Sequence, residues 1–127
     1  MEICPISAVL FAKDHRRIAA FYIDVFDAAV AAQDDQHTSL EIAGFRLVVQ
    51  QIPTQMARQI QVEDPPKRRE HGAVRLTFPV RDVGKRRATA KGLGGQIDEQ
   101  PPKWAEHGST FYLGADPEGN VVGCDAR

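Results

Sequence analysis

The stretch Val74-Arg75-Leu76-Thr77-Phe78-Pro79-Val80-Arg81 alternates between apolar residues and polar residues or proline, and it runs directly into Asp82. A period of two predicts a β-strand over residues 74–81 with one apolar face. That face would consist of Val74, Leu76, Phe78 and Val80. An Asp directly after a strand is typical of a helix N-cap, because its carboxylate accepts from a free backbone N–H. We therefore expect a helix from Asp82 to about residue 91, ended by the glycine-rich segment 92–95.

The same order of elements occurs earlier in the chain. The pattern of residues 6–13 predicts a strand, and Asp14 is a second candidate N-cap. The apolar spacing after Asp14 predicts a helix that ends at about residue 26. Asp82 lies 68 residues after Asp14. This offset is about half of the chain, so the two strand–helix pairs indicate an internal duplication.

Each half continues with a predicted hairpin. Gly44 marks the first turn, and Asp116-Pro117-Glu118-Gly119 marks the second. The four strands expected around these turns are residues 38–43, 45–50, 109–113 and 120–125. Two copies of a βαβββ-like unit therefore account for the chain. The expected organisation is a single domain over residues 1–127, with module one over about 5–52, a linker over 53–72 and module two over about 73–127.

Composition and charge restrict the class of protein. Of the 127 residues, 43% are hydrophobic and 26% charged, which is typical of a soluble globular protein, and no apolar run is long enough to span a bilayer. The net charge of -1 gives no excess of cations for nucleic acid or an anionic membrane surface. The start of the chain does not resemble a secretory signal, which favours the cytoplasm. Both basic clusters, residues 67–69 and 85–87, are expected to be solvated surface. Cys4 and Cys124 are expected to be small buried hydrophobes.

Several of these motifs together resemble the glyoxalase/bleomycin-resistance/dioxygenase (vicinal oxygen chelate) superfamily, from about Ile6 to Asp125. They are Val9-Leu10-Phe11-Ala12-Lys13-Asp14, Ala20-Phe21-Tyr22-Ile23-Asp24-Val25-Phe26, Phe78-Pro79-Val80-Arg81-Asp82, Gly94-Gly95 and Asp116-Pro117-Glu118-Gly119-Asn120-Val121-Val122. The resemblance implies an α+β fold in which two tandem βαβββ modules form a cupped mixed sheet. By likeness to the bleomycin-resistance proteins, it also implies a homodimer.

Enzymes of that superfamily hold a divalent metal in the cup, typically through His or Gln, Glu, His and Glu. The resemblance puts the corresponding positions of this chain at Ser7, Arg75, Gly123 and either Val49 or Gln50. A serine hydroxyl is a poor ligand, arginine carries a fixed positive charge and glycine has no side chain. Gln50 alone could ligate. We therefore expect no metal, no other cofactor and no metal-dependent activity.

The residues expected to line the cup are Ser7, Val9, Phe11, Gln50, Arg75, Thr77, Trp104 and His107. Arg75 could bind a ligand's carboxylate or phosphate through its planar guanidinium, or form an internal ion pair with Asp125 or Glu41. Trp104 could close one side of a pocket, pack in the core or lie at a dimer contact.

The histidines give a weaker signal. His71 and His107 both occur as Glu-His-Gly, and the two could form a pair at the rim of the cup or lie in separate exposed turns. His15, in the first turn of a predicted helix, is expected at the surface, because an imidazolium there opposes the helix dipole.

Three functions follow as hypotheses, and the sequence identifies no catalytic residues. The first is a metal-free protein that binds a small anionic or neutral aromatic molecule. The alternative is an enzyme: a lyase or dioxygenase whose metal ligands lie at other positions, or a metal-free isomerase with Glu or His as general base. The third is a dimerisation module without a ligand.

Overall fold

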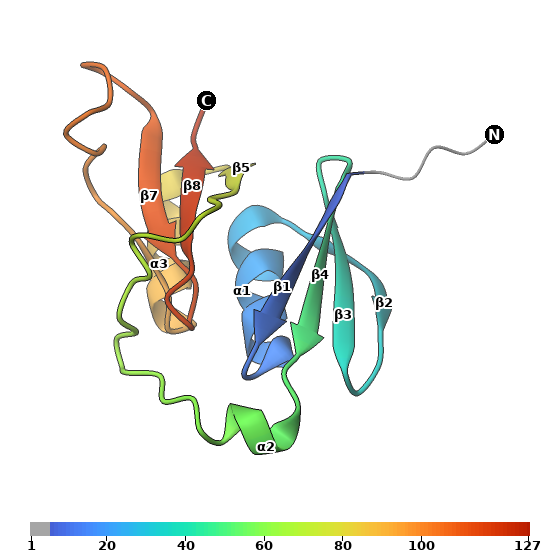
Figure 1. The fold of residues 1–127 in the computed structure, drawn as a ribbon. Helices are drawn as coiled ribbons and strands as arrows, with labels where there is room; N and C mark the ends of the chain where they lie inside the picture. Colours follow the sequence, from blue (N-terminus) through green and yellow to red (C-terminus); the bar gives the residue numbers. More distant parts are fainter. Residues whose placement is uncertain (1–5) are drawn as a thin grey trace.

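The computed structural model describes residues 6–127 and contains two mixed sheets of four strands each (Figure 1). Sheet one has the order β1 (Ser7–Ala12), β4 (Phe45–Gln51), β3 (His37–Ile42) and β2 (Ala29–Gln33). Sheet two has the order β5 (Thr77–Pro79), β8 (Val121–Asp125), β7 (Phe111–Ala115) and β6 (Gln96–Ile97). In both sheets the first strand of the module runs parallel to the last, and the other pairs are antiparallel. The identical order confirms the α+β fold of two tandem βαβββ modules. No strand hydrogen bonds join the two sheets within residues 6–127.

The helices are α1 (His15–Phe26), α2 (Thr54–Ala57) and α3 (Val83–Gly92). Asp14 caps α1 as predicted, since its carboxylate accepts from the backbone N–H of Arg17 at 3.2 Å. Asp82 is the N-cap residue of α3, but its φ of 49° is left-handed and its side chain accepts no capping hydrogen bond. The sequence therefore predicted the position of the second cap correctly and its hydrogen bond wrongly.

Some strands differ from the sequence pattern. β5 is limited to Thr77–Pro79, and the preceding residue Val74 is 78% exposed instead of lying on a buried face. The sequence did not predict β2 or β6. All residues of β2 are exposed, so no apolar alternation marks that strand, and β6 has only two residues.

α1 provides the shared core of the two modules and lies between the two sheets in Figure 1. One hydrophobic cluster contains residues from both halves of the chain, among them Leu40 of β3 and Val122 of β8. The ring of Phe78 in β5 lies 5.5 Å from that of Tyr22 and 5.0 Å from that of Phe26. The aromatic face of α1 therefore packs on its own sheet and on the first strand of module two. Among residues 6–127, no helix has the length and hydropathy needed to cross a membrane.

The turn between β7 and β8 joins module two to the start of α1. The carboxylate of Glu118 accepts from the backbone N–H groups of Lys13 at 2.7 Å and Asp14 at 3.0 Å. The hydroxyl of Tyr22 donates to the buried carboxylate of Asp116 at 2.9 Å. Burial raises the pKa of both Tyr22 and Asp116, because it disfavours their charged forms. The turn motif thus has a structural role between the modules.

His15 is buried, so the expectation of a surface histidine is wrong. Its Nδ1 lies 3.1 Å from the Thr38 hydroxyl and its Nε2 lies 3.2 Å from the carbonyl oxygen of Asp35. The first turn of α1 packs against sheet one, and this packing outweighs the unfavourable position of an imidazole near the helix N-terminus.

Two arginines of the basic clusters form ion pairs with distant residues, which corrects the expectation that both clusters are solvated. Arg68 in the linker binds the carboxylate of Asp98 at 2.5 Å. Arg86 of α3 binds Asp27, the residue after α1, at 2.8 Å. Both pairs connect segments that are distant in sequence.

Cys124 is buried with a free thiol, as the sequence predicted. Burial raises the pKa of this thiol to about 12, because a thiolate would be poorly solvated there. Cys4 lies outside the described residues.

Candidate functional site

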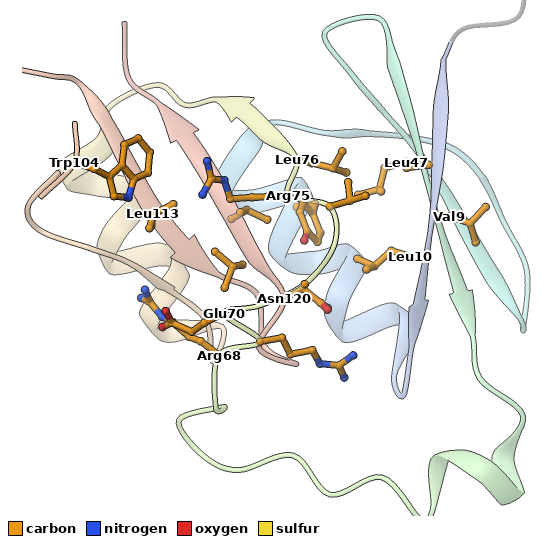
Figure 2. Close-up of a pocket in the computed structure, with 17 residues that line it drawn as sticks. Val9, Leu10, Leu47, Arg68, Glu70, Arg75, Leu76, Trp104, Leu113 and Asn120 are labelled. Carbon is orange, nitrogen blue, oxygen red and sulfur yellow. The ribbon is translucent and has the colours of Figure 1, made fainter. Parts of the chain in front are cut away.

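A cleft of about 520 Å³ lies between the two modules (Figure 2). β1 and β4 supply residues on one side, β7 and β8 on the other, and the segment 68–76 before β5 contributes to the wall. Most of its side chains are apolar and include Leu10, Leu47, Leu76, Leu113 and Val122. Its size is in the range typical of small-molecule sites, roughly 300–1,000 Å³.

Arg75 stands at one end of this cleft on a pair of aromatic rings. Its guanidinium carbon lies 5.6 Å from the ring centroid of Trp104 and 5.6 Å from that of Phe111. The two rings are themselves 5.6 Å apart, and Trp104 is 65% exposed, so it forms part of a rim and not of the core. Cation–π contacts of this kind hold a guanidinium in place and leave its N–H donors free for a ligand.

The structure does not contain the internal ion pair considered for Arg75. Glu41 is bound to Arg46 at 2.8 Å, and Asp125 is bound to Arg127 at 2.7 Å. Among residues 6–127, no carboxylate lies within 4.0 Å of the Arg75 guanidinium.

At the mouth of the cleft, Arg68 is held by two acceptors. Its guanidinium donates to Asp98 at 2.5 and 3.1 Å and to the side-chain oxygen of Gln96 at 2.9 Å. The Asp98 carboxylate raises the pKa of Arg68 further above its usual value. Arg68 is therefore already neutralised by Asp98, whereas Arg75 is not.

The position expected for the closing metal ligand has no room for a side chain. Gly123 of β8 pairs with Thr77 of β5 and Leu113 of β7. A Cβ atom at residue 123 would meet Phe111 Cε2 at 2.7 Å and would also collide with Thr77 Oγ1. The ring of Phe111 therefore occupies the space into which a ligand from β8 would project.

The remaining position expected for a metal ligand, Val49 or Gln50, does not replace the missing ligand at Gly123. Val49 is buried in the core, whereas its neighbour Gln50 pairs with Phe11 across β1 and β4 and is partly exposed. Of these two candidates, only Gln50 has a side chain outside the core, and it supplies a single amide oxygen. Across residues 6–127, no three His, Cys, Asp or Glu side chains are grouped so that they could hold a metal ion. The residues present thus do not fit the divalent metal that the family resemblance implies.

The structure brings only part of the predicted cup lining together. Val9, Arg75 and Trp104 line the cleft, although Figure 2 shows the Val9 side chain on the side of β1 away from Arg75. Ser7 and Phe11 share the exposed alternate positions of β1 with Val9. This outer face of sheet one therefore does not point at Arg75 of the same chain.

The remaining predicted residues lie at other places. Thr77 lines a separate cavity of about 230 Å³ beside the turn between β3 and β4. His107 lines an open groove that also includes Trp104. Both His71 and His107 are exposed.

The sequence reasoning missed Phe111, Tyr22 and the leucines of the cleft. A signal for Phe111 existed, because Phe111 and Leu113 alternate in a predicted strand and so share one face. No local signal shows that Leu10 and Leu47 line a cleft, because that placement depends on how module two packs beside β1.

Comparisons with known proteins agree with this architecture. The sequence model of a family described as a glyoxalase-like domain matches residues 7–123. A search of curated protein sequences found no significant match.

Among solved structures, the chain is similar to the fosfomycin resistance protein FosX from Listeria monocytogenes, with 15% identity, a TM-score of 0.66 and coverage of 100% of this chain and 92% of that one. It is also similar to a glyoxalase-related enzyme from Fulvimarina pelagi, with 21% identity, a TM-score of 0.66 and coverage of 96% and 86%. A glyoxalase/bleomycin resistance protein/dioxygenase family enzyme from Burkholderia phytofirmans gives 20% identity, a TM-score of 0.62 and coverage of 93% and 94%. At these identities the structural similarity shows the fold. Because the family model matches nearly the whole chain, this protein belongs to the glyoxalase-like domain family of the vicinal oxygen chelate superfamily.

Proposed function

We propose that this chain is a small-molecule binding protein that holds an anionic ligand on Arg75 without a metal. The observation that carries the proposal is the free guanidinium of Arg75 on the rings of Trp104 and Phe111, at the end of a largely apolar cleft. A planar guanidinium matches the two oxygens of a carboxylate, and the indole next to it offers a surface for a flat ligand.

The crowding at Gly123 supports the metal-free part of the proposal. FosX from Listeria monocytogenes was solved in complex with Mn(II) and sulfate. In this chain the Phe111 ring fills the space beside Gly123, and the Arg75 guanidinium lies 5.6 Å from the centroid of that ring.

We also propose that the protein forms a homodimer through the outer face of sheet one. Val9 and Phe11 expose 53% and 63% of their surface there. A second copy of the chain is the proposed occupant, because it could bring the Arg75 face of its sheet two to this face, which the chain's own Arg75 does not reach. Each chain contains the two halves of the cup apart from each other, and such a pairing would bring one half from each chain together. The cytoplasmic location remains a prediction from the sequence.

The test begins with metal analysis of protein purified without chelator, followed by thermal-shift and calorimetric titration with benzoate. We expect no stoichiometric Ni, Zn, Fe or Mn, and a benzoate-dependent rise in Tm. Arg75→Ala should abolish that rise, whereas Arg81→Ala, at an exposed arginine outside the cleft, should retain it. Stoichiometric metal would overturn the proposal and favour the lyase or dioxygenase alternative. An unchanged response of Arg75→Ala to benzoate would refute the role of Arg75.

A further inference from the structure

We infer that the cleft behind Arg75 accommodates the hydrophobic body of the ligand, so that the ligand class is carboxylic acids with an extended apolar group. This inference rests on the proposed function and specifies its substrate class. It depends on three features of the cleft: the separation of Arg75 from the leucines, the pairing of the Tyr22 hydroxyl, and the small excess of positive charge in the lining.

The first feature is the arrangement of the lining. Figure 2 shows the Arg75 side chain extending toward Trp104, while Leu10, Leu47 and Leu76 lie on the other side of the cleft. A ligand whose carboxylate binds Arg75 would therefore extend its remaining atoms toward these leucines. Apolar groups placed there leave water for an apolar wall, which is favourable in proportion to the area buried.

The second feature is the state of Tyr22, the one tyrosine that lines the cleft. Its hydroxyl already donates to Asp116, whose carboxylate also accepts from the side chain of Asn120 and from the backbone N–H of Glu118. Burial raises the pKa of Tyr22, so it stays neutral. Because Tyr22 is only 2% exposed and its hydroxyl is paired, an apolar ligand at this wall would not strip water from an unpaired polar group there, which is the usual penalty.

The third feature is the small excess of positive charge around the cleft, where Arg68, Arg69 and Arg75 face Glu70 and Asp98. Arg68 is occupied by Asp98 and Gln96, whereas neither Arg75 nor Arg69 has a carboxylate within 4.0 Å among residues 6–127. The exposed Arg69 and Glu70 at the mouth carry opposite charges. This balance favours a monoanion over a polyphosphate or a dicarboxylate.

The experiment compares acids of increasing length on the wild-type protein by calorimetry: butyrate, hexanoate, octanoate and decanoate, each below its micelle concentration. Each methylene that enters the cleft should tighten the Kd by about fourfold, and the gain should stop once the cleft is full. Decylamine, which has a similar tail and a positive head group, should bind far more weakly than decanoate.

A variant pair locates the effect. Leu113→Trp places a larger side chain in the cleft and should remove the gain with chain length, while Leu93→Trp, at a leucine outside the cleft, should keep it. The wild-type series decides the question even if the Leu113 variant fails to fold.

The possible failures are distinguishable. If benzoate and butyrate bind through Arg75 but longer acids gain nothing, the inference is wrong and the proposed function stands. If decylamine binds as well as decanoate, the carboxylate specificity is wrong. If no acid of any length binds, both the inference and the proposed function are overturned.

Discussion

Replacing Glu118 with alanine should strongly destabilise the protein, because this side chain joins the two modules. Its buried carboxylate accepts from the backbone N–H groups of Lys13 and Asp14, at 2.7 and 3.0 Å. A hydrogen bond to a charged group contributes roughly 1.5–3 kcal/mol, and the lower value applies here because both bonds are only partly buried. The loss of both bonds should therefore lower the free energy of unfolding by about 3 kcal/mol, a large part of the roughly 5–15 kcal/mol typical of a domain.

Equilibrium unfolding in urea, followed by far-UV circular dichroism, measures this effect. Glu118→Gln retains one acceptor oxygen but turns an N–H₂ group toward the other donor, so we expect an intermediate loss. Glu106→Ala, at an exposed loop position, is the matched control and should change stability by no more than about 0.5 kcal/mol. If Glu118→Ala is as stable as Glu106→Ala, then the turn does not hold the modules together and the reasoning is refuted.

Two further predictions concern buried positions in sheet two. Gly123→Ala should lower the free energy of unfolding by about 1–3 kcal/mol, because the new Cβ meets the Phe111 ring at 2.7 Å. The loss should be smaller in a Phe111→Ala background. Equal losses in both backgrounds would contradict the steric explanation. Cys124 should resist iodoacetamide at about pH 8 in the folded protein, since a pKa of about 12 leaves roughly one thiolate in 10⁴, and react after denaturation. Peptide mapping separates Cys124 from Cys4, and rapid labelling of folded Cys124 would show that the thiol is accessible and ionised.

Much of the secondary structure follows from local signals. The cap at Asp14, the end of α3 at the glycine-rich segment and the turn at Gly44 all lie where the sequence placed them, because capping and turn formation depend on neighbouring residues. The 68-residue offset predicted the two modules for the same reason, because each module repeats a segment of strand periodicity followed by a segment of helix periodicity.

The errors occur where distant contacts override the local pattern. The alternation over 74–81 predicted a long strand, but the first part of this segment lies along the cleft and pairing with β8 is limited to Thr77–Pro79. The position of His15 in the first turn of a helix predicted a surface residue, but His15 is buried because α1 packs on β3. The sequence predicted a solvated Arg68, but the fold places Asp98, 30 residues further along the chain, beside it.

The sequence by itself determined the internal duplication and, apart from β2 and β6, the order of the elements in each module, while the family resemblance implied poor metal-binding residues at Ser7, Arg75 and Gly123. The duplication and the element order depend on periodicity and spacing, and the poor ligand chemistry at the positions implied by the resemblance depends on single side chains. Only the tertiary structure decided that Arg75 lies on Trp104 and Phe111 instead of pairing with Glu41 or Asp125, and that a cleft opens between the modules. The physical reason is that partners for a side chain and the shape of a cleft depend on the packing of segments that are far apart in the chain.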